Sequence, residues 1–529
     1  MCLILKHCAF RGETASIRMM NTNFNLRFYG RVVAALTVAL LMLWLAGCSG
    51  SSPSSSGMQP SNPTLTQISS DPYTIPPGQH ATEVEPHVLA NGSTLVAAFQ
   101  TGRIAPGGAT DIGWATSTDG GATWSHGFLP GLTTGEGTGP YDAASDPEVA
   151  YDAKHGVWMI ASLPISSTLQ TPAVMVSRST DGMTWQSPVG VDTTALSSDK
   201  NWIVCDSWSA SPYYGNCYVE WDDYANNDEI LMSTSSDGGV TWGPATPTAD
   251  LAGGIGGQPL VQPSGTVVVP ILLDAGEMAA FSSNNGGANW TAPANIALVQ
   301  VHTDAGGIRS GPLPSAVVDG AGTVWVVWED CRFRANCSNN DLVYSTSADG
   351  VNWSAVARVP IDQTSGSADY FIPGIGIDRA TSGASAHVAI HYYYYPQTSC
   401  TVSTCQLYVG FISSANGGST WNTPVTLAGP MQLGWLPNSQ NGLMVGDYIA
   451  TAFTNGVPHG VFAVAKANAE TTFNEATFSD QGLTIAATSR QLSSAQDRPL
   501  HKLSDKIERE RPEKGVIPPS RRKAKRSAK

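Results

Sequence analysis

A short turn motif that occurs six times constrains the fold of this chain more than any other feature. The motif reads Ser-x-Asp/Asn-(x)-Gly-x-Thr/Asn-Trp. It favours a tight hairpin, because glycine accepts a positive φ and the Asp side chain can bond the turn's own amides. Successive motif tryptophans lie 61, 57, 48, 63 and 68 residues apart. This period is longer than that of a solenoid repeat and indicates radial repetition of small sheets. The copies are STDGGATW (117–124), STDGMTW (179–185), SSDGGVTW (235–242), SNNGGANW (283–290), SADGVNW (347–353) and SANGGSTW (414–421).

The segments between the motifs have the pattern of short strands. Each holds two apolar or alternating runs with turn residues between them, such as PEVAYD and GVWMIASLP. A third run leads into the motif, and a short fourth run follows its Trp. Four strands with their loops need about 55–60 residues, which is close to the period. We therefore predict an all-β fold, a β-propeller of four-stranded blades in which each motif closes the hairpin between strands three and four.

The number of blades is harder to derive from the sequence than the type of fold. Seven pairs of first and second strands start near residues 85, 147, 201, 259, 314, 372 and 447, but only six pairs are followed by a motif. The last pair leads to FNEATF, so we expect the stretch around 65–73 to supply the outer strand of the final blade. Seven blades are favoured and six are the alternative. The predicted organisation is a leader (1–48), a linker (49–62), the propeller (63–480) and a basic tail (481–529).

The leader indicates export. RFYGRVVAALTVALLMLWLAGC joins basic residues to a short apolar run, which is typical of a secretory signal. Its Leu-Ala-Gly-Cys ending resembles a bacterial lipobox, which would make Cys48 the lipidated first residue; a plain signal or signal anchor is the alternative. The Ser/Pro/Gly linker after it suits a tether. We expect a protein of the cell envelope that touches the membrane only through its lipid, on the periplasmic or the cell-surface side.

The other six cysteines form three close pairs. In an exported chain, local even pairing predicts disulfides that staple loops. A zinc site is the alternative, but no zinc-ligand spacing surrounds these cysteines and HExxH is absent. The expected disulfides are Cys205–Cys217, Cys331–Cys337 and Cys400–Cys405.

Charge is unevenly distributed along the chain. Residues 49–489 contain 10 basic and 36 acidic residues, whereas residues 490–529 contain 13 basic and 5 acidic. So acidic a core excludes nucleic-acid binding by its surface. The basic tail is expected to be disordered, with contact to anionic envelope polymers as one role and no function as the other. We expect a monomer without a cofactor; residues 222–229 (DDYANNDE) have the oxygens for structural calcium but lack the EF-hand order.

The repeat also predicts which face carries function. All motifs and all turns between strands one and two share one face, so the opposite face receives the starts of the first strands around the channel. Polar residues gather at those positions and at the ends of the second strands. At the starts these are Glu83, Glu85, Asp146, Glu148, Asp199, Lys200, Asn201, Gln258, Arg309, Asp369, Tyr370, Asp447 and Tyr448; at the ends they are Arg103, Asp222, Asp223, Asp274 and residues 329–334.

These repeated motifs on a propeller resemble the sialidase superfamily, also called BNR or Asp-box repeat proteins, over about residues 80–475. The stretches DKNWIVCD, WEDCRFRANCSNNDLVYSTSADG and VGDYIATAF also resemble secreted bacterial sialidase-like proteins. In true sialidases the resemblance implies three arginines that grip the substrate carboxylate, a Tyr nucleophile activated by a Glu, and an Asp acid. The fold is strongly implied and the activity less so.

The resemblance suggests candidate site residues, with one departure. The Phe/Tyr-Arg-Ile-Pro motif ahead of the first blade is replaced by VEPHV, so Arg103 or Arg334 would have to supply the first arginine. Alternatively, the arginines of the 331–337 loop pair with their acidic neighbours, Tyr448 is a packing residue, and the two glutamates only line the channel. The catalytic candidates are Tyr448, Glu148, Asp146 and Glu85, and the substrate-binding candidates are Arg103, Arg309, Arg332, Arg334, Tyr370 and Asp447.

Three functions remain open on the sequence. The first, which we favour, is a surface-anchored, sialidase-like glycoside hydrolase acting on extracellular glycans, possessing exo-α-sialidase-like activity. The second is a non-catalytic propeller that binds glycans or proteins, for which IHYYYYP (390–396) would suit if its tyrosines faced outward. The third is an envelope assembly factor with a flat face.

Overall fold

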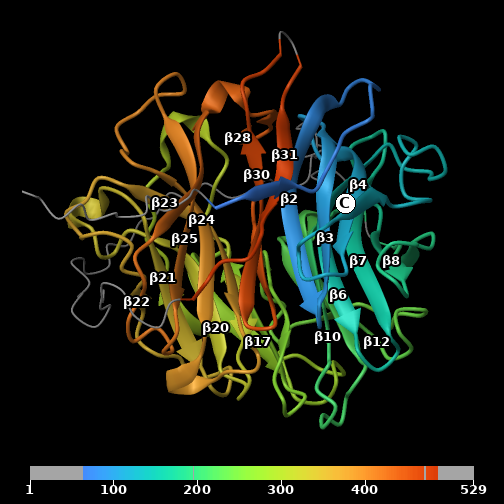
Figure 1. The fold of residues 1–529 in the computed structure, drawn as a ribbon. Coiled ribbons are helices and arrows are strands. Elements are labelled where there is room, and N and C mark those ends of the chain that lie inside the picture. Colours follow the sequence, from blue (N-terminus) through green and yellow to red (C-terminus); the bar gives the residue numbers. More distant parts are fainter. Residues whose placement is uncertain (1–62, 195, 470–471, 486–529) are drawn as a thin grey trace, which may run out of the picture. The chain divides into compact units, whose positions relative to one another are not determined.

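The computed structural model describes residues 63–194, 196–469 and 472–485, which all belong to one unit spanning Asn62–Lys529. The predicted leader with Cys48, the whole predicted linker, and the tail from residue 486 onward lie outside the described residues. Among the described residues the regular structure is strand with five 3₁₀ turns, so the all-β prediction is confirmed (Figure 1). Over the same residues, no helix has the length and apolar character needed to cross a membrane.

The strands form antiparallel sets, most of them of four strands and one of five. The first set is β2 (Gln79–Asn91), β3 (Thr94–Arg103), β4 (Ala109–Ser117) and β5 (Ser125–Phe128), followed by β6 (Ala143–Asp152), β7 (Val157–Ile165), β8 (Val174–Ser179) and β9 (Val189–Asp192). Next come β10 (Ser198–Cys205), β11 (Cys217–Asp223), β12 (Glu229–Ser235) and β13 (Thr246–Pro247).

The later sets repeat this order. They are β14 (Gly254–Ile255) and β15 (Leu260–Val261) beside β16 (Val267–Leu273), β17 (Glu277–Ser283) and β18 (Ala294–Leu298); β19 (Ser315–Val318), β20 (Val324–Asp330), β21 (Asp341–Ser347) and β22 (Ala357–Arg358); and β23 (Asp369–Ile377), β24 (Val388–Tyr395), β25 (Gln406–Ser414) and β26 (Val425–Gln432). A short ribbon, β27 (Asn438–Ser439) with β28 (Gly442–Leu443), leads into β29 (Ala450–Thr454), β30 (Val457–Ala465) and β31 (Glu475–Asp480).

The final set is completed by the start of the domain. Strand β1 (Leu65–Gln67) pairs antiparallel with β31, with Leu65 opposite Asp480. The expectation that the stretch around residue 65 supplies the missing outer strand is therefore confirmed. In the sequence, the clue was a last strand pair with no motif after it.

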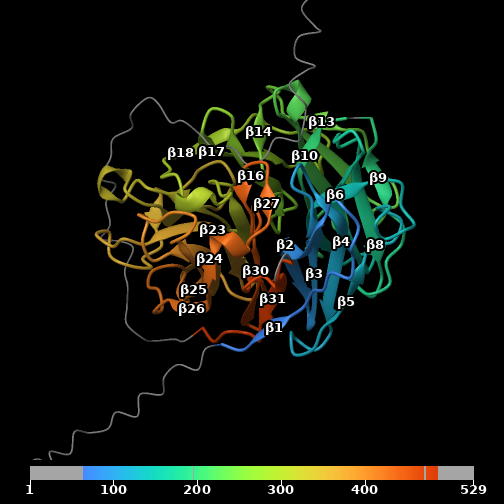
Figure 2. The same cartoon turned by 90° about the horizontal axis from the view of Figure 1, so that it is seen from above.

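The sets follow one another around a centre, as the colours from blue β2 to red β31 show in the view from above (Figure 2). Their first strands touch in sequence: β2 contacts β6, β6 contacts β10, β10 contacts β15, β15 contacts β19, β19 contacts β23, β23 contacts β29, and β29 contacts β2. The core lies between adjacent sets, so β3 and β4 bury both faces. One cluster, for example, joins Val96 and Ile112 of the first set to Val149 and Ile160 of the second.

The repeated motifs close the hairpins between the third and fourth strands, as predicted. In the turn at Asp237, Gly239 N donates to Ser235 Oγ at 3.0 Å, and the Asp237 carboxylate accepts from Val240 N and Thr241 N, each at 3.0 Å. The motif Trp packs on the preceding set: Trp290 lies 6.2 Å edge-on from Tyr218. The motifs are structural, because their side chains satisfy the turns and seal the joints between sets.

The three predicted disulfides are present, with Cys205 bound to Cys217, Cys331 to Cys337 and Cys400 to Cys405. The first joins two adjacent strands, β10 and β11, where the two cysteines lie opposite each other in the ladder. The other two close short loops with sequence separations of 6 and 5 residues.

Candidate functional site

Four of the first strands contain the same irregularity where they approach the centre. In β2, β6, β10 and β23 the pairing register breaks around one residue with positive φ. These residues are Glu85 (φ 56°), Asp146 (φ 47°), Lys200 (φ 46°) and Ile372 (φ 47°). Such a bulge re-aims its side chain, and a non-glycine residue holds positive φ only where its surroundings enforce it. The repeat thus brings three charged side chains to equivalent positions.

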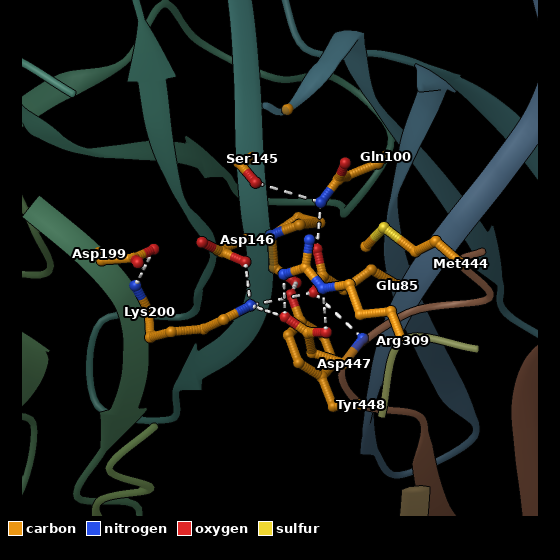
Figure 3. Close-up of polar contacts among 12 residues, drawn as sticks. Glu85, Gln100, Ser145, Asp146, Asp199, Lys200, Arg309, Met444, Asp447 and Tyr448 are labelled. Carbon is orange, nitrogen blue, oxygen red and sulfur yellow. Dashed lines mark hydrogen bonds and ion pairs between the residues drawn. The ribbon is translucent and has the colours of Figure 1, made fainter. Parts of the chain in front are cut away.

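The carboxylates of Glu85 and Asp146 meet the ammonium group of Lys200. Its ammonium Nζ lies 3.2 Å from Glu85 Oε1 and 3.0 Å from Asp146 Oδ1, and it also contacts Asp447 Oδ2 (Figure 3). All four side chains are buried. One cation therefore ties together first-strand starts from three sets and the loop ahead of β29.

Arg309 adds a second cation. Its Nε donates to Asp447 Oδ1 at 2.7 Å and its Nη2 bonds Asp447 Oδ2, a two-pronged pair (Figure 3). The backbone N–H of Asp447 also donates to Glu85 Oε1 at 3.2 Å. We call Glu85, Asp146, Lys200, Arg309 and Asp447 the central charge cluster.

The cluster sets contrasting protonation states. Burial raises the pKa of Glu85 to about 7, although Lys200 beside it acts in the opposite direction. Burial would also raise the pKa of Asp447, but Arg309 and Lys200 hold it well below its usual range. Burial disfavours charge on Lys200, yet the carboxylates of Asp146, Asp447 and Glu85 keep its pKa well above normal. The site therefore combines a firmly ionised carboxylate with a carboxyl that exchanges its proton near neutral pH.

Tyr448 and Glu148 lie next to the cluster and near each other, but the hydrogen bond of the phenol goes to a backbone carbonyl. Burial, with Glu148 as a neighbour, raises the pKa of Tyr448 well above its usual value, and burial likewise raises that of Glu148. The Tyr448 hydroxyl donates to the Pro147 carbonyl at 3.3 Å, and Asn201 Nδ2 donates to Glu148 Oε2 at 2.9 Å. The Tyr448 ring is packed 5.2 Å edge-on against Trp202. Tyr448 is a buried, neutral phenol in this state.

A pocket opens over part of the cluster. It is partly open to solvent and leaves about 30 Å³ for water-sized molecules, so it is a small hollow and not a deep ligand cavity. Its walls are formed by the loop after β3, the strands β6 and β7, the loop after β7, and the start of β10. The lining residues are Pro106, Gly107, Gly108, Ser145, Asp146, Leu163, Ile165, Leu169, Thr171, Asp199, Lys200 and Arg309.

The structure does not bring the other predicted arginines into the cluster. Arg332 pairs with Asp330, at 2.6 Å from Nη2 to Oδ2, and donates to the Leu298 carbonyl. Arg334 pairs with Asp341 and Asp362, each at 2.5 Å. Arg332 and Arg334 are therefore not placed to grip a substrate. They form internal ion pairs that hold loops, as the alternative interpretation of the sequence had it.

Arg103 and Tyr370 are also engaged elsewhere. Arg103 is buried, with Nε 3.0 Å from Met444 Sδ and Nη1 bonded to the Gly108 carbonyl, so it supports the pocket wall from behind. Tyr370 is buried edge-on against Tyr392 at 5.7 Å. The tyrosines of IHYYYYP are buried or half-buried in β24, which removes the outward aromatic surface considered for a binding module.

Lys200 is the main residue missing from the candidate set, together with the supporting side chains Gln100, Ser145 and Asn201. Gln100 Nε2 bonds Glu85 Oε2 and lies 3.1 Å from Ser145 Oγ. The sequence alone hides this equivalence, because VEPHV, SDPEV and SDKNW aligned letter by letter set Asp199 beside Glu85 and Asp146, whereas the register breaks of the strands place Lys200 there. A lysine at a position otherwise held by acids indicates a countercharge.

No cation-binding cluster accompanies the site. Across the residues that the structure describes, no group of three or more His, Cys, Asp or Glu side chains is arranged to hold a metal ion. In the 222–229 segment considered for calcium, Asp222 is buried in β11 and Asp223 caps a 3₁₀ turn (Tyr224–Asn226) by accepting from Ala225 N at 3.2 Å.

Comparisons with known proteins give only distant similarities. No family model and no curated protein matches the sequence. Among solved structures, the chain is similar to the Hadza microbial sialidase Hz136 (TM-score 0.40, 14% identity over 76% of this chain), of whose length it spans 66%. It is also similar to a Penicillium chrysogenum α-L-arabinanase complexed with arabinobiose (TM-score 0.41, 14% identity, 80% of this chain and 99% of that one). A third is an ulvan lyase of polysaccharide lyase family PL25 (TM-score 0.46, 11% identity, 80% and 98%).

Proposed function

We propose that the chain is a seven-bladed propeller, exported and lipid-anchored at Cys48, that hydrolyses extracellular glycans. The seven blades are supported by the contacts of the first strands, which return from β29 to β2. Export is supported by three disulfides, since such bonds persist in oxidising compartments. The sialidase-type activity rests on the resemblance carried by the repeated motifs.

The observation that carries the hydrolase proposal is the pocket floor. Asp146, Lys200 and Arg309 line a hollow at the face where the first strands begin, and Glu85 and Asp447 lie directly behind them. Glycoside hydrolysis commonly needs two carboxyl groups in different protonation states, one to donate a proton and one to act as base or nucleophile. Asp146 lines the pocket, and Glu85, whose pKa burial raises to about 7, contacts the same Lys200 ammonium as Asp146 does.

Two chemical schemes fit this arrangement. In the carboxylate scheme, Asp146 acts directly on the sugar or on the attacking water. In the sialidase-type scheme, Tyr448 is the nucleophile and Glu148 receives its proton, which requires the floor to open because Tyr448 is buried. The schemes assign the decisive role to different residues and can be separated by substitution.

The test is hydrolysis of fluorogenic glycosides by the full chain, with a panel that includes a sialoside and several neutral sugars. Asp146→Asn should lower kcat by about 10²–10⁴-fold under the carboxylate scheme, and Tyr448→Phe should do so under the sialidase-type scheme. Asp250→Asn, at an exposed residue, is the matched control and should leave the rate unchanged. If no glycoside is hydrolysed by the folded wild-type protein, the hydrolase proposal fails.

A non-catalytic glycan-binding propeller is the second candidate, and one observation favours it. Tyr448 is 6% exposed and its hydroxyl donates to a backbone carbonyl, so it does not face the pocket as a nucleophile. Binding of glycans without turnover of any glycoside would support this candidate.

A further inference from the structure

Buried acidic side chains greatly outnumber buried cations in this fold. Among the described residues, twenty Asp and Glu side chains are buried, against six Lys and Arg. Five of these cations are already paired, two of them in the central charge cluster and three with aspartates of the segment 330–362. A buried carboxyl without a cation avoids the cost of an isolated charge by keeping its proton or by accepting hydrogen bonds. Most of the buried acids must therefore be stabilised by a proton or by hydrogen-bond donors.

One pair of such acids lies on β11. Glu220 and Asp222 are two residues apart, so their side chains leave the strand on the same face. Both are buried, and none of their four carboxylate oxygens has a hydrogen-bond partner within the described residues. The backbone of the next set closes on Glu220, because a Cβ added at Gly257 would lie 2.6 Å from Glu220 Cδ. An ionised carboxylate here would be buried without a donor from the described residues, which is costly.

The charged groups that act most strongly on Asp222 are acids. Asp199 faces Asp222 across the ladder between β10 and β11. Lys200 follows Asp199 in the chain, but its ammonium group contacts the carboxylates of the central charge cluster. Like charges so close together disfavour ionisation, and a proton relieves their repulsion. Burial raises the pKa of Asp222 well above its usual value, and so do the nearby carboxyls of Asp199, Glu220, Asp228 and Asp274. We call Glu220 and Asp222 the β11 acid pair.

A second pair of buried acids, Glu329 and Asp369, joins β20 to the start of β23. Asp369 Oδ2 has no hydrogen-bond partner within the described residues. Burial raises the pKa of Asp369 to about 9 and that of Glu329 well above its usual value. His302 Nε2 lies 3.7 Å from Asp369 Oδ2, but burial lowers the pKa of His302, so the imidazole is neutral at neutral pH. The other charged neighbours that act on the pair are Asp304, Asp330 and Arg334, of which only the arginine opposes ionisation being suppressed.

We propose that this fold is adapted to an acidic medium, with the β11 acid pair and the Glu329–Asp369 pair folded as neutral acids whose loss of protons loosens the joints between sets. Both pairs lie at such joints. The β11 acid pair is closed by Gly257 of the next set, and Glu329 accepts from Ile372 N of the next set at 3.4 Å. The inference concerns the medium in which the protein is stable, so it goes beyond the proposed hydrolysis and does not depend on it.

The repeated turn motifs resist acid in the same structure. Hydrogen bonds from Thr123 hold the pKa of Asp119 at about 2, and hydrogen bonds from the amides of Thr184 and Met183 do the same for Asp181. A carboxyl whose folded-state pKa is lowered contributes stability above its unfolded value, here 3.8, and this contribution is lost only as pH falls toward 2. The motif hairpins therefore stay closed in a medium in which the buried acids keep their protons.

The expected dependence of stability on pH follows from these pKa shifts. A carboxyl whose folded-state pKa is raised contributes stability that is complete below its unfolded value, near 4, and is lost as pH rises through the folded value. Buried imidazoles act in the opposite direction. Burial lowers the pKa of His87, His302 and His459, so their contribution is complete above about 6.5 and is lost as pH falls. Between pH 6.5 and 8 the imidazoles are largely neutral in both states, and the buried carboxyls set the slope.

Urea unfolding of the full chain between pH 6.5 and 8 tests the inference. The equilibrium constant for unfolding should rise at least about tenfold per pH unit, which corresponds to the release of at least one proton on unfolding. A constant that is level or falls with rising pH over this range would overturn the inference. Calcium chloride at pH 8 should leave the denaturation midpoint unchanged. A higher midpoint with calcium would show that a cation compensates the buried acids, which would also overturn it.

Matched variants assign the protons to the buried pairs. Glu220→Gln combined with Asp222→Asn keeps the shape of the β11 acid pair and removes its titration. The rise of the unfolding constant per pH unit should then be at least about tenfold smaller than in the wild type. Asp250→Asn, at an exposed residue, should leave the rise unchanged. Glu329→Gln removes one titrating group of the second pair and serves the same purpose if the double variant does not fold. A rise equal to that of the wild type in these buried-pair variants would overturn the assignment.

Discussion

Replacing Lys200 by methionine removes the cation that joins the central charge cluster while nearly keeping the side chain's volume. In the variant, Glu85, Asp146 and Asp447 remain buried with Arg309 as their only cation among the contacts described for the cluster. Breaking a buried ion pair by removing one partner costs about 3–5 kcal/mol. We therefore expect the free energy of unfolding to fall by about this amount at pH 8.

The loss of unfolding free energy in Lys200→Met should be larger at high pH than at low pH. The folded-state pKa of Glu85 is about 7 against 4.5 for the unfolded chain, so the stability that its proton provides is complete below about 4.5 and is lost as pH rises through 7. Without Lys200, the larger of the two positive charges that lower this pKa is gone, and Glu85 stays protonated to higher pH. At pH 5 a neutral Glu85 leaves fewer uncompensated charges. The deficit of Lys200→Met should therefore be smaller at pH 5 than at pH 8.

Urea unfolding followed by tryptophan fluorescence at both pH values measures these differences. Lys154→Met is the matched control, because Lys154 is exposed, and it should change stability by no more than about 0.5 kcal/mol. A loss below about 1 kcal/mol for Lys200→Met at pH 8, or a loss equal at both pH values, would refute the reasoning.

Three further predictions concern stability. Glu220 is fully buried, and neither of its carboxylate oxygens has a hydrogen-bond partner within the described residues. Burial raises its pKa well above 4.5, so the folded state loses stability as pH rises above about 4.5. Glu220→Gln should therefore raise the denaturation midpoint at pH 8 but not at pH 4.5. Asp237→Ala removes a turn carboxylate that accepts two amides and should cost about 1–2 kcal/mol in urea unfolding, with a null effect refuting the structural role of the motifs. Replacing Cys205 and Cys217 together by alanine opens a link with a sequence separation of 12 residues and should cost about 3 kcal/mol, whereas an unchanged midpoint would show that this link contributes nothing.

Local sequence signals predicted the frame of the fold well. The motif turns, the three disulfides and the pairing of β1 with β31 each depend on residues close in sequence or on a visible gap in the repeat. Turn chemistry acts within a few residues and is therefore readable from the sequence. The starts of the first strands were likewise identified as the place where charged residues gather.

The partners of individual charged residues could not be predicted in the same way. Arg334 pairs with Asp341 and Asp362, which reach it from 7 and 28 residues along the chain, so its neutralisation depends on how loops fold back. The direction of Lys200 depends on a register break in β10, because a bulge turns a side chain that alternation alone would place differently. These are tertiary effects that a list of residue types does not contain.

The most direct test of the account is to find where a sugar-borne electrophile reacts. An epoxyalkyl glycoside of a neutral sugar forms an ester when a nearby carboxylate opens its epoxide, and peptide mapping by mass spectrometry locates the modified residue. The account predicts modification of Asp146, which lines the pocket, with protection by an excess of the unreactive glycoside and loss of the label in Asp146→Asn. Labelling confined to exposed carboxylates such as Asp250, without protection, would contradict the claim that this pocket is the sugar site.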